Sequence, residues 1–188
     1  MTDNPGPVRD YLEWHQAYDD PASDLSWRLS QVQAYIRSAL DQIHGQATVL
    51  SLCAGDGRDV LQVLAERGDS SRIKTTLIEL HPVLAQRARE FAAKAGLANV
   101  TVRTVDAGNT AAYADVVPAD LVIMIGIFGN ISTDDLRRTI CTTVVPTRCD
   151  HAVVAKYGRP RREQPGPWLA DRSWLPRVGL PRIRSSSG

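Results

Sequence analysis

The sequence has few cysteines, no long apolar run and almost no net charge. Its cysteines form neither a C-x-x-C pair nor a disulfide framework, so a metal site and an oxidised scaffold have little support. No run approaches the roughly 18 apolar residues that a membrane helix needs, and residues 1–8 lack the pattern of a secretory signal. We therefore expect a cytoplasmic protein with no membrane partner. The three cysteines are Cys53, Cys141 and Cys149.

The charges are distributed unevenly along the 188 residues, although the net charge is only +1. Residues 1–147 hold 13 Lys and Arg against 18 Asp and Glu, whereas residues 148–188 hold 9 against 3. Such asymmetry separates an acidic segment from a basic one. From Tyr157 onward, five prolines and seven arginines leave no helical or strand period. We expect little of this last segment to pack.

Residues 1–47 are predicted to form a helical cap. Apolar residues recur at helical spacing from Val8, and a second helical pattern follows the Asp20-Pro21 break. Ser23 or Asp24 can cap the second helix, because a short side-chain oxygen accepts from the free amides of the first turn. The apolar stripe of that helix comprises Leu29, Val32, Ile36, Ala39, Leu40 and Ile43.

Residues 48–146 alternate strand and helix signals, which indicates βαβ units. We therefore predict an α/β fold with a Rossmann-like parallel sheet flanked by helices, joined by right-handed crossovers. Residues 147–188 would form an atypical basic tail, although residues 151–155 could add a fifth strand. The other predicted strands are 48–52, 75–78, 100–105 and 121–125. The predicted helices start near Val60 and at Pro82, and the second carries Val83, Leu84, Ala88 and Phe91.

A glycine loop, Ser51-Leu-Cys-Ala-Gly-Asp-Gly-Arg-Asp59, follows the first predicted strand. In an open parallel sheet, ligands bind beyond the carboxyl ends of the strands. Gly55 and Gly57 allow a tight turn and let a ligand approach the backbone closely. A G-x-G pair by itself also fits a purely structural turn.

Two acidic residues end the next predicted strands. Glu79 lies 22 residues past Gly57, the spacing at which a carboxylate accepts hydrogen bonds from ribose hydroxyls in nucleotide-binding units. Asp106 ends the third strand, where a carboxylate can accept from an adenine amino group. Either acid alone fits a solvated loop charge. Together with the glycine loop, they favour a nucleoside site.

These motifs resemble those of class I S-adenosylmethionine-dependent methyltransferases. Residues 49–57 resemble the family's first motif, and Glu79-Leu-His-Pro82 resembles the second. Val105-Asp-Ala107 resembles the adenine-binding turn, and residues 119–124 resemble the fourth strand. The resemblance spans residues 48–145. It departs from the pattern in the first motif, where a serine replaces the usual acid and a cysteine replaces the first glycine.

The resemblance implies S-adenosylmethionine as cofactor and methyl transfer to a small molecule. It places the Gly55 and Gly57 backbone at the methionyl and ribose groups, Glu79 at the ribose diol, and Asp106 with Ala107 at adenine. The sequence identifies neither the acceptor nor an oligomeric state. The implied cofactor-binding residues are Ser51, Cys53, Ala54, Gly55, Asp56, Gly57, Glu79, Leu80, Asp106, Ala107 and Gly126.

A general base is needed only for some acceptors, and the candidates for it are weak. Tyr11 and His15 lie on an apolar helical stripe, where packed side chains are commoner than catalytic ones. Tyr18, Phe128 and Asn130 complete the residues expected near the mouth of the site. Asp59 is expected to stabilise the start of the following helix through its dipole.

Other ligands and roles stay open at this point. An NAD-binding Rossmann unit is the second ligand hypothesis, but it needs a glycine where position 60 is Val. The basic tail could be an arm for nucleic acid, which its composition disfavours, or a solvated tail. A third hypothesis is an aberrant end that leaves a non-catalytic or truncated S-adenosylmethionine-binding protein.

Overall fold

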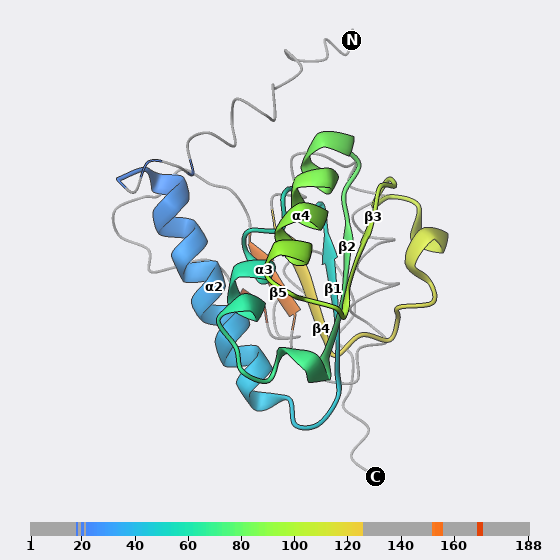
Figure 1. Cartoon of the computed structure of the whole chain (residues 1–188), viewed down its shortest axis with the longest axis horizontal. Coiled ribbons are helices and arrows are strands. Elements are labelled where there is room, and N and C mark those ends of the chain that lie inside the picture. The colour runs from blue at the N-terminus through green and yellow to red at the C-terminus, as the bar shows by residue number, and fades with distance from the viewer. Residues whose placement is uncertain (1–17, 19, 21, 126–151, 156–168, 171–188) are drawn as a thin grey trace, which may run out of the picture.

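The computed structural model describes residues 18, 20, 22–125, 152–155 and 169–170. Its strands form one sheet in the order β3-β2-β1-β4-β5-β6 (Figure 1). The pairings from β3 through β5 are all parallel, which confirms the predicted parallel sheet and its fifth strand. The strands are β1 (Ala47–Leu52), β2 (Ile73–Ile78), β3 (Val100–Arg103), β4 (Leu121–Ile125), β5 (Ala152–Ala155) and β6 (Leu169–Ala170).

Two details of the sheet correct the sequence predictions. β6 lies in the basic tail, where we predicted no strand, and it pairs antiparallel with β5. Such pairing uses backbone groups at the sheet edge, so it needs no periodic side-chain pattern. β3 ends at Arg103 and not at Val105. The Glu79 amide donates to the Arg103 carbonyl at 3.1 Å, and the chain leaves the sheet beyond this bond.

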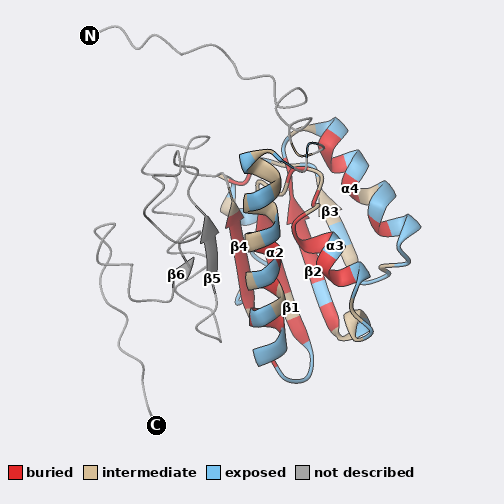
Figure 2. Cartoon of the chain, turned by 90° about the vertical axis from the view of Figure 1, so that its left-hand side faces the viewer, coloured by how far each residue is buried: buried red, intermediate tan, exposed pale blue. Residues whose placement is uncertain are grey.

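The helices α2 (Asp24–Gln42), α3 (Val60–Ala65) and α4 (Pro82–Lys94) pack on one face of the sheet (Figure 2). Ser23 caps α2 by accepting from the Ser26 amide at 3.1 Å, as predicted. Every residue of the predicted stripe is buried except Leu29, which is half-buried. The first predicted helix, before residue 18, lies outside the described residues.

The apolar pattern of the sequence predicted the buried face of α4 only in part. Leu84 and Ala88 are buried, whereas Val83 and Phe91 are 43% and 39% exposed. Three of the four buried residues of α4 are alanines, so its buried face carries mostly small side chains. The buried face of α4 consists of Leu84, Ala85, Ala88 and Ala92.

The opposite face of the sheet packs against residues 107–119, which include the 3-10 turn η3 (Thr110–Tyr113). Tyr113 is fully buried there, and its hydroxyl donates to the Ala107 carbonyl at 2.9 Å. This bond fixes the chain just after Asp106. The second 3-10 turn, η2 (Ser70–Arg72), leads into β2. Among the described residues, no helix combines the length and the apolar character needed to span a bilayer.

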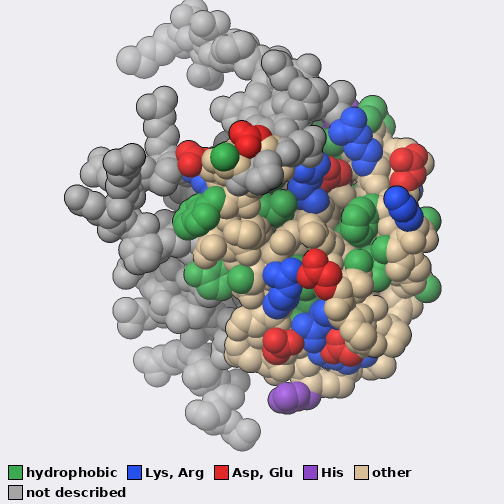
Figure 3. Space-filling model, turned by 60° about the vertical axis from the view of Figure 1, so that its left-hand side comes forward, with side chains coloured by type: hydrophobic (Ala, Val, Ile, Leu, Met, Phe, Trp, Pro, Cys, Tyr) green, Lys and Arg blue, Asp and Glu red, His purple; other side chains and the backbone are tan. Residues whose placement is uncertain are grey.

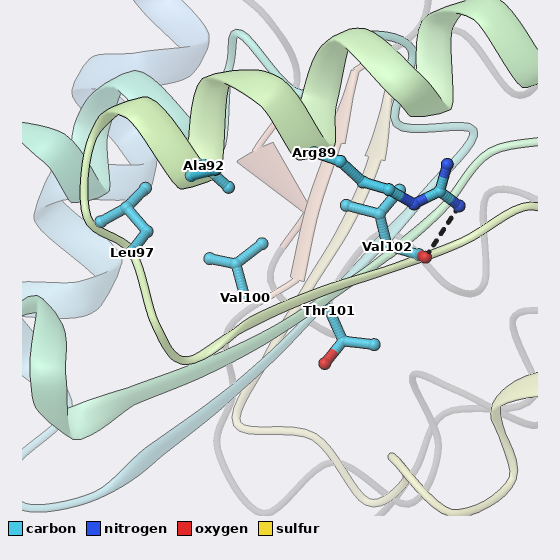
Figure 4. Close-up of a pocket in the computed structure, with 7 residues that line it drawn as sticks. Arg89, Ala92, Leu97, Val100, Thr101 and Val102 are labelled. Atoms are coloured by element: carbon cyan, nitrogen blue, oxygen red, sulfur yellow. Dashed lines mark hydrogen bonds between the residues drawn. The ribbon is translucent and has the colours of Figure 1, made fainter.

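β3 is the edge strand next to α4, and part of its edge is capped by the chain itself. The Arg89 guanidinium of α4 donates to the Val102 carbonyl at 3.1 Å (Figure 4). The Val100 amide donates to the Leu97 carbonyl at 3.3 Å. Edge groups capped in this way are less able to pair with another strand. The groove between α4 and β3 has a volume of about 410 Å³.

Candidate functional site

The loop between β1 and α3 forms the centre of the site, and its backbone turns sharply. Cys53, Gly55 and Gly57 all have positive φ, at 52°, 60° and 72°. A Cβ at Gly57 would lie 2.6 Å from Leu77 Cδ2 and 2.7 Å from Leu61 Cδ1. Gly57 therefore lets the loop pack directly against β2 and α3. Cys53 adopts a conformation that is uncommon for a residue with a side chain.

Glu79 connects this loop to the end of β2. Its carboxylate is buried, and Oε2 accepts from the Gly55 amide at 2.7 Å. Oε1 accepts from the His81 amide at 2.8 Å, and the Ala54 amide donates to the Ile78 carbonyl at 3.0 Å. A carboxylate has about four acceptor positions, so two amides leave room for ligand hydroxyls. The acid thus organises the loop and keeps acceptor capacity.

The ends of β1, β2 and β3 converge on Cys53. Burial, and then the nearby charges of Glu79 and Asp106, raise the pKa of the Cys53 thiol to about 12. This thiol stays protonated at neutral pH. Both acids that the sequence placed at strand ends therefore lie within electrostatic reach of one loop residue. The structure brings together the three motifs, as the sequence predicted.

Asp106 and Leu80 form the open side of the same edge. Asp106 is exposed, and its Oδ1 accepts from the Gly108 amide at 2.8 Å, which shapes the turn around buried Ala107. Leu80 is 64% exposed directly beside Glu79. An exposed apolar side chain beside a carboxylate suits a ligand that has a flat apolar ring and polar groups at its rim.

Two buried polar atoms without partners in the described part of the chain lie at the carboxyl ends of the strands, one near the end of β1 and one just before α4. Ser51 Oγ and His81 Nδ1 have no hydrogen-bond partner among the described residues. Buried polar groups are normally satisfied, so each such atom asks for an explanation. Ser51 stands where the resembling family has an acid, next to the predicted methionyl site. These features fit an adenosine-containing cofactor with a polar amino-acid tail.

Asp59 forms the N-cap of α3, and its Oδ1 accepts from the Val60 amide at 2.8 Å. The predicted role at the helix start is consistent with this position. Burial, and then the charge of Asp56, raise the pKa of Asp59 to about 6. Burial therefore disfavours the charged form of this carboxyl.

Sequence reasoning did not predict the contacts of Arg58 with Asp56 and Tyr18. The Arg58 guanidinium donates to Asp56, with Nε 2.9 Å from Oδ1, and its Cζ lies 4.7 Å from the Tyr18 ring centroid. Only the Asp-x-Arg spacing could have suggested the first contact, and no local signal predicts the second. The base candidates Tyr11, His15 and Asn130, together with Gly126, lie outside the described residues.

The parallel sheet, with a glycine loop and two acids at its carboxyl edge, has the class I methyltransferase architecture. A family described as "Putative methyltransferase" matches residues 24–147, more than half of the chain. The chain belongs to this methyltransferase family. No curated protein matches it.

Several solved structures with the same fold are methyltransferases of low sequence identity. A precorrin-6y C5,15-methyltransferase from Geobacter metallireducens has a TM-score of 0.53 at 17% identity, over 68% of this chain and 62% of that one. A Geobacter sulfurreducens methyltransferase in complex with S-adenosylhomocysteine has a TM-score of 0.51 at 19% identity, over 71% and 51%. A Synechocystis magnesium protoporphyrin IX methyltransferase with bound S-adenosylmethionine has a TM-score of 0.61 at 11% identity, over 89% and 77%. The chain thus spans less than two thirds of the first two.

Proposed function

We propose that this chain binds S-adenosylmethionine and transfers its methyl group to a small molecule. Membership of a methyltransferase family supports the reaction class. Structures of the same fold that hold S-adenosylmethionine or S-adenosylhomocysteine support the cofactor. The observation that carries the proposal is the buried Glu79 carboxylate, which joins the glycine loop to the end of β2 and keeps free acceptor positions.

In this proposal each part of the cofactor meets a suitable group. The backbone of Gly55 and Gly57 approaches the methionyl and ribose groups, and Glu79 accepts from the ribose hydroxyls. Asp106 accepts from the adenine amino group, and Leu80 packs against the ring. Ser51, Cys53, Ala54, Asp56 and Ala107 complete the described part of the proposed site.

S-adenosylmethionine supplies a methyl group on a positively charged sulfur, which is already activated for in-line displacement. The main task of the protein is therefore to align the acceptor and exclude water, and alignment can supply effective molarities of about 10⁵ M. A base is required only for a hydroxyl or a protonated amine. Tyr11, His15 and Asn130 are the candidates for it.

Two observations support a small-molecule acceptor. The names of two solved structures with this fold refer to a precorrin and a porphyrin. The acidic residues 1–147 carry all the motifs, which suits a nucleic-acid substrate poorly. Retention of RNA or DNA on filters by the full chain, lost on deletion of residues 148–188, would contradict this part of the proposal.

Calorimetric titration with S-adenosylhomocysteine tests cofactor binding directly. We expect binding by the wild-type chain and about 10- to 100-fold weaker binding by Glu79→Gln, because hydrogen bonds to a charged group contribute about 1.5–3 kcal/mol. Glu79→Gln keeps an acceptor for the loop. Glu66→Gln is the matched control, because Glu66 is an exposed acid that pairs with Arg37. Thermal unfolding of each variant checks that it is folded.

The same titration separates the alternatives. Equal binding by wild type and Glu79→Gln would overturn the assignment of the ribose site, and binding of NAD alone would favour a dinucleotide protein. Binding of S-adenosylhomocysteine without methylated product across a metabolite extract would favour a non-catalytic binding module. Radiolabelled methyl transfer to the extract is the measurement for that last step.

A further inference from the structure

Arg58 contacts two segments that are far apart in the sequence. Its Nε lies 2.9 Å and 3.0 Å from the two carboxylate oxygens of Asp56, and its Nη2 donates to the second of them. Its Cζ lies 4.7 Å from the centroid of the Tyr18 ring, a cation–π distance. The ion pair is partly removed from water, since the side chains of Arg58 and Asp56 are 27% and 11% exposed. Both interactions are stronger in such surroundings.

The backbone around Arg58 is held from the same side. Gln33, on α2, is buried, and its Nε2 donates to the Arg58 carbonyl at 3.0 Å. The same nitrogen donates to Gln62 Oε1 on α3 at 3.0 Å. The Ser26 hydroxyl donates to the Tyr18 carbonyl at 2.8 Å. This bond holds Tyr18 against the first turn of α2. Gln33 and Tyr18 therefore both contact Arg58, and Gln33 also connects its position to α3.

We propose that Arg58 is a positioning residue for the cofactor, which holds the glycine loop in its binding conformation through Asp56 and is itself held by the Tyr18 ring. The proposal rests on the proposed function. Asp56 lies between Gly55 and Gly57, so the direction of its side chain is tied to the two peptide units that face the cofactor. The Arg58 guanidinium restrains the Asp56 side chain, and the Tyr18 ring restrains the guanidinium.

This arrangement predicts an energetic coupling between Tyr18 and Arg58 that appears in cofactor affinity. A loop held before binding loses less freedom when the ligand arrives, which raises affinity. Removal of the guanidinium should therefore weaken binding by about 10-fold, in line with one ion pair and one cation–π contact. Removal of the Tyr18 ring should have a similar but smaller effect, because the pair with Asp56 remains.

The test is a double-mutant cycle in the full chain, read by calorimetric titration with S-adenosylhomocysteine. Arg58→Ala should bind about 10-fold more weakly and Tyr18→Ala about 5-fold more weakly, with the double variant close to Arg58→Ala alone. Tyr18→Phe keeps the ring and should bind like wild type. Arg58→Lys keeps the charge but not the planar fork, and should recover only part of the affinity.

Arg37→Ala is the matched control, because Arg37 forms an ion pair between α2 and the end of α3 away from the loop. Its affinity for S-adenosylhomocysteine should equal that of wild type. Additive losses in the double variant, or wild-type affinity in Arg58→Ala, would overturn the positioning role while leaving the proposed function in place. Absence of binding by the wild-type chain would instead refute the proposed function, and this inference with it.

Discussion

The glycine loop and the exposed connection between α3 and β2 hold their titratable groups in opposite ways. At the loop, burial raises the pKa of Cys53 and of Asp59. On the surface, the Arg67 and Arg72 guanidinium groups hold the pKa of Asp69 well below its usual range. Figure 3 shows basic and acidic side chains close together on the described part of this surface. The comparison teaches that burial disfavours the charged form of a group at the loop, whereas neighbouring guanidinium groups favour the charged form of a carboxyl on the surface.

The largest expected effect comes from steric crowding at the loop. Gly57→Ala should destabilise the protein by about 2–4 kcal/mol, because its Cβ would meet Leu77 and Leu61 in addition to a positive φ. Gly45→Ala is the control, since Gly45 has a φ of 77° but no atom within 4 Å of its Cβ position. Its cost should be only about 1 kcal/mol. Chemical denaturation measures both, and equal losses would contradict the close packing of the loop.

An intermediate effect is expected from the buried carboxyl of Asp59. Its pKa of about 6, raised from 3.8, means that the folded state binds this proton more tightly than the unfolded chain does. Stability should therefore fall as the pH rises from about 4 to about 6, by about 2 kcal/mol from this group. Asp59→Asn keeps an acceptor for the Val60 amide and should remove this fall. Unfolding curves across the pH range measure the difference.

The smallest effect is expected on the surface, and its sign is opposite. The pKa of Asp69 is lowered, so this carboxylate contributes stability at neutral pH that is lost as the pH falls through the acid range. Asp69→Asn should destabilise the protein at pH 7 by less than about 1 kcal/mol, as is usual for exposed ion pairs. Added salt should reduce the loss. A gain in stability would break the comparison between the two regions.

The sequence predicted the elements and residues that depend on local patterns. Alternating strand and helix signals were enough for the parallel sheet, and the position of Glu79 after β2 was enough to place its carboxylate beside Gly55. The burial of Ala85 and the exposure of Phe91 depend on how α4 is rotated against the sheet, which local period sets only roughly.

The link from Tyr18 to Arg58 was beyond sequence reasoning for a different reason. These residues are 40 positions apart, and their contact exists only because α2 lies across α3 and brings the chain before it to the loop. The pairing of β6 with β5 likewise depends on an available sheet edge and not on the residues of β6 themselves. Patterns along the chain do not encode such through-space contacts.

Glu79 is constrained twice, once by folding and once by the proposed ligand. Because its carboxylate accepts from the Gly55 and His81 amides, it contributes to the stability of the folded chain as well as to the proposed site. A library of all substitutions at this position, sorted only for folded protein, should already be enriched in Glu, Gln and Asp. A second round of sorting for cofactor capture should then separate the acids from the amide, so a two-stage selection would resolve the two roles of one side chain.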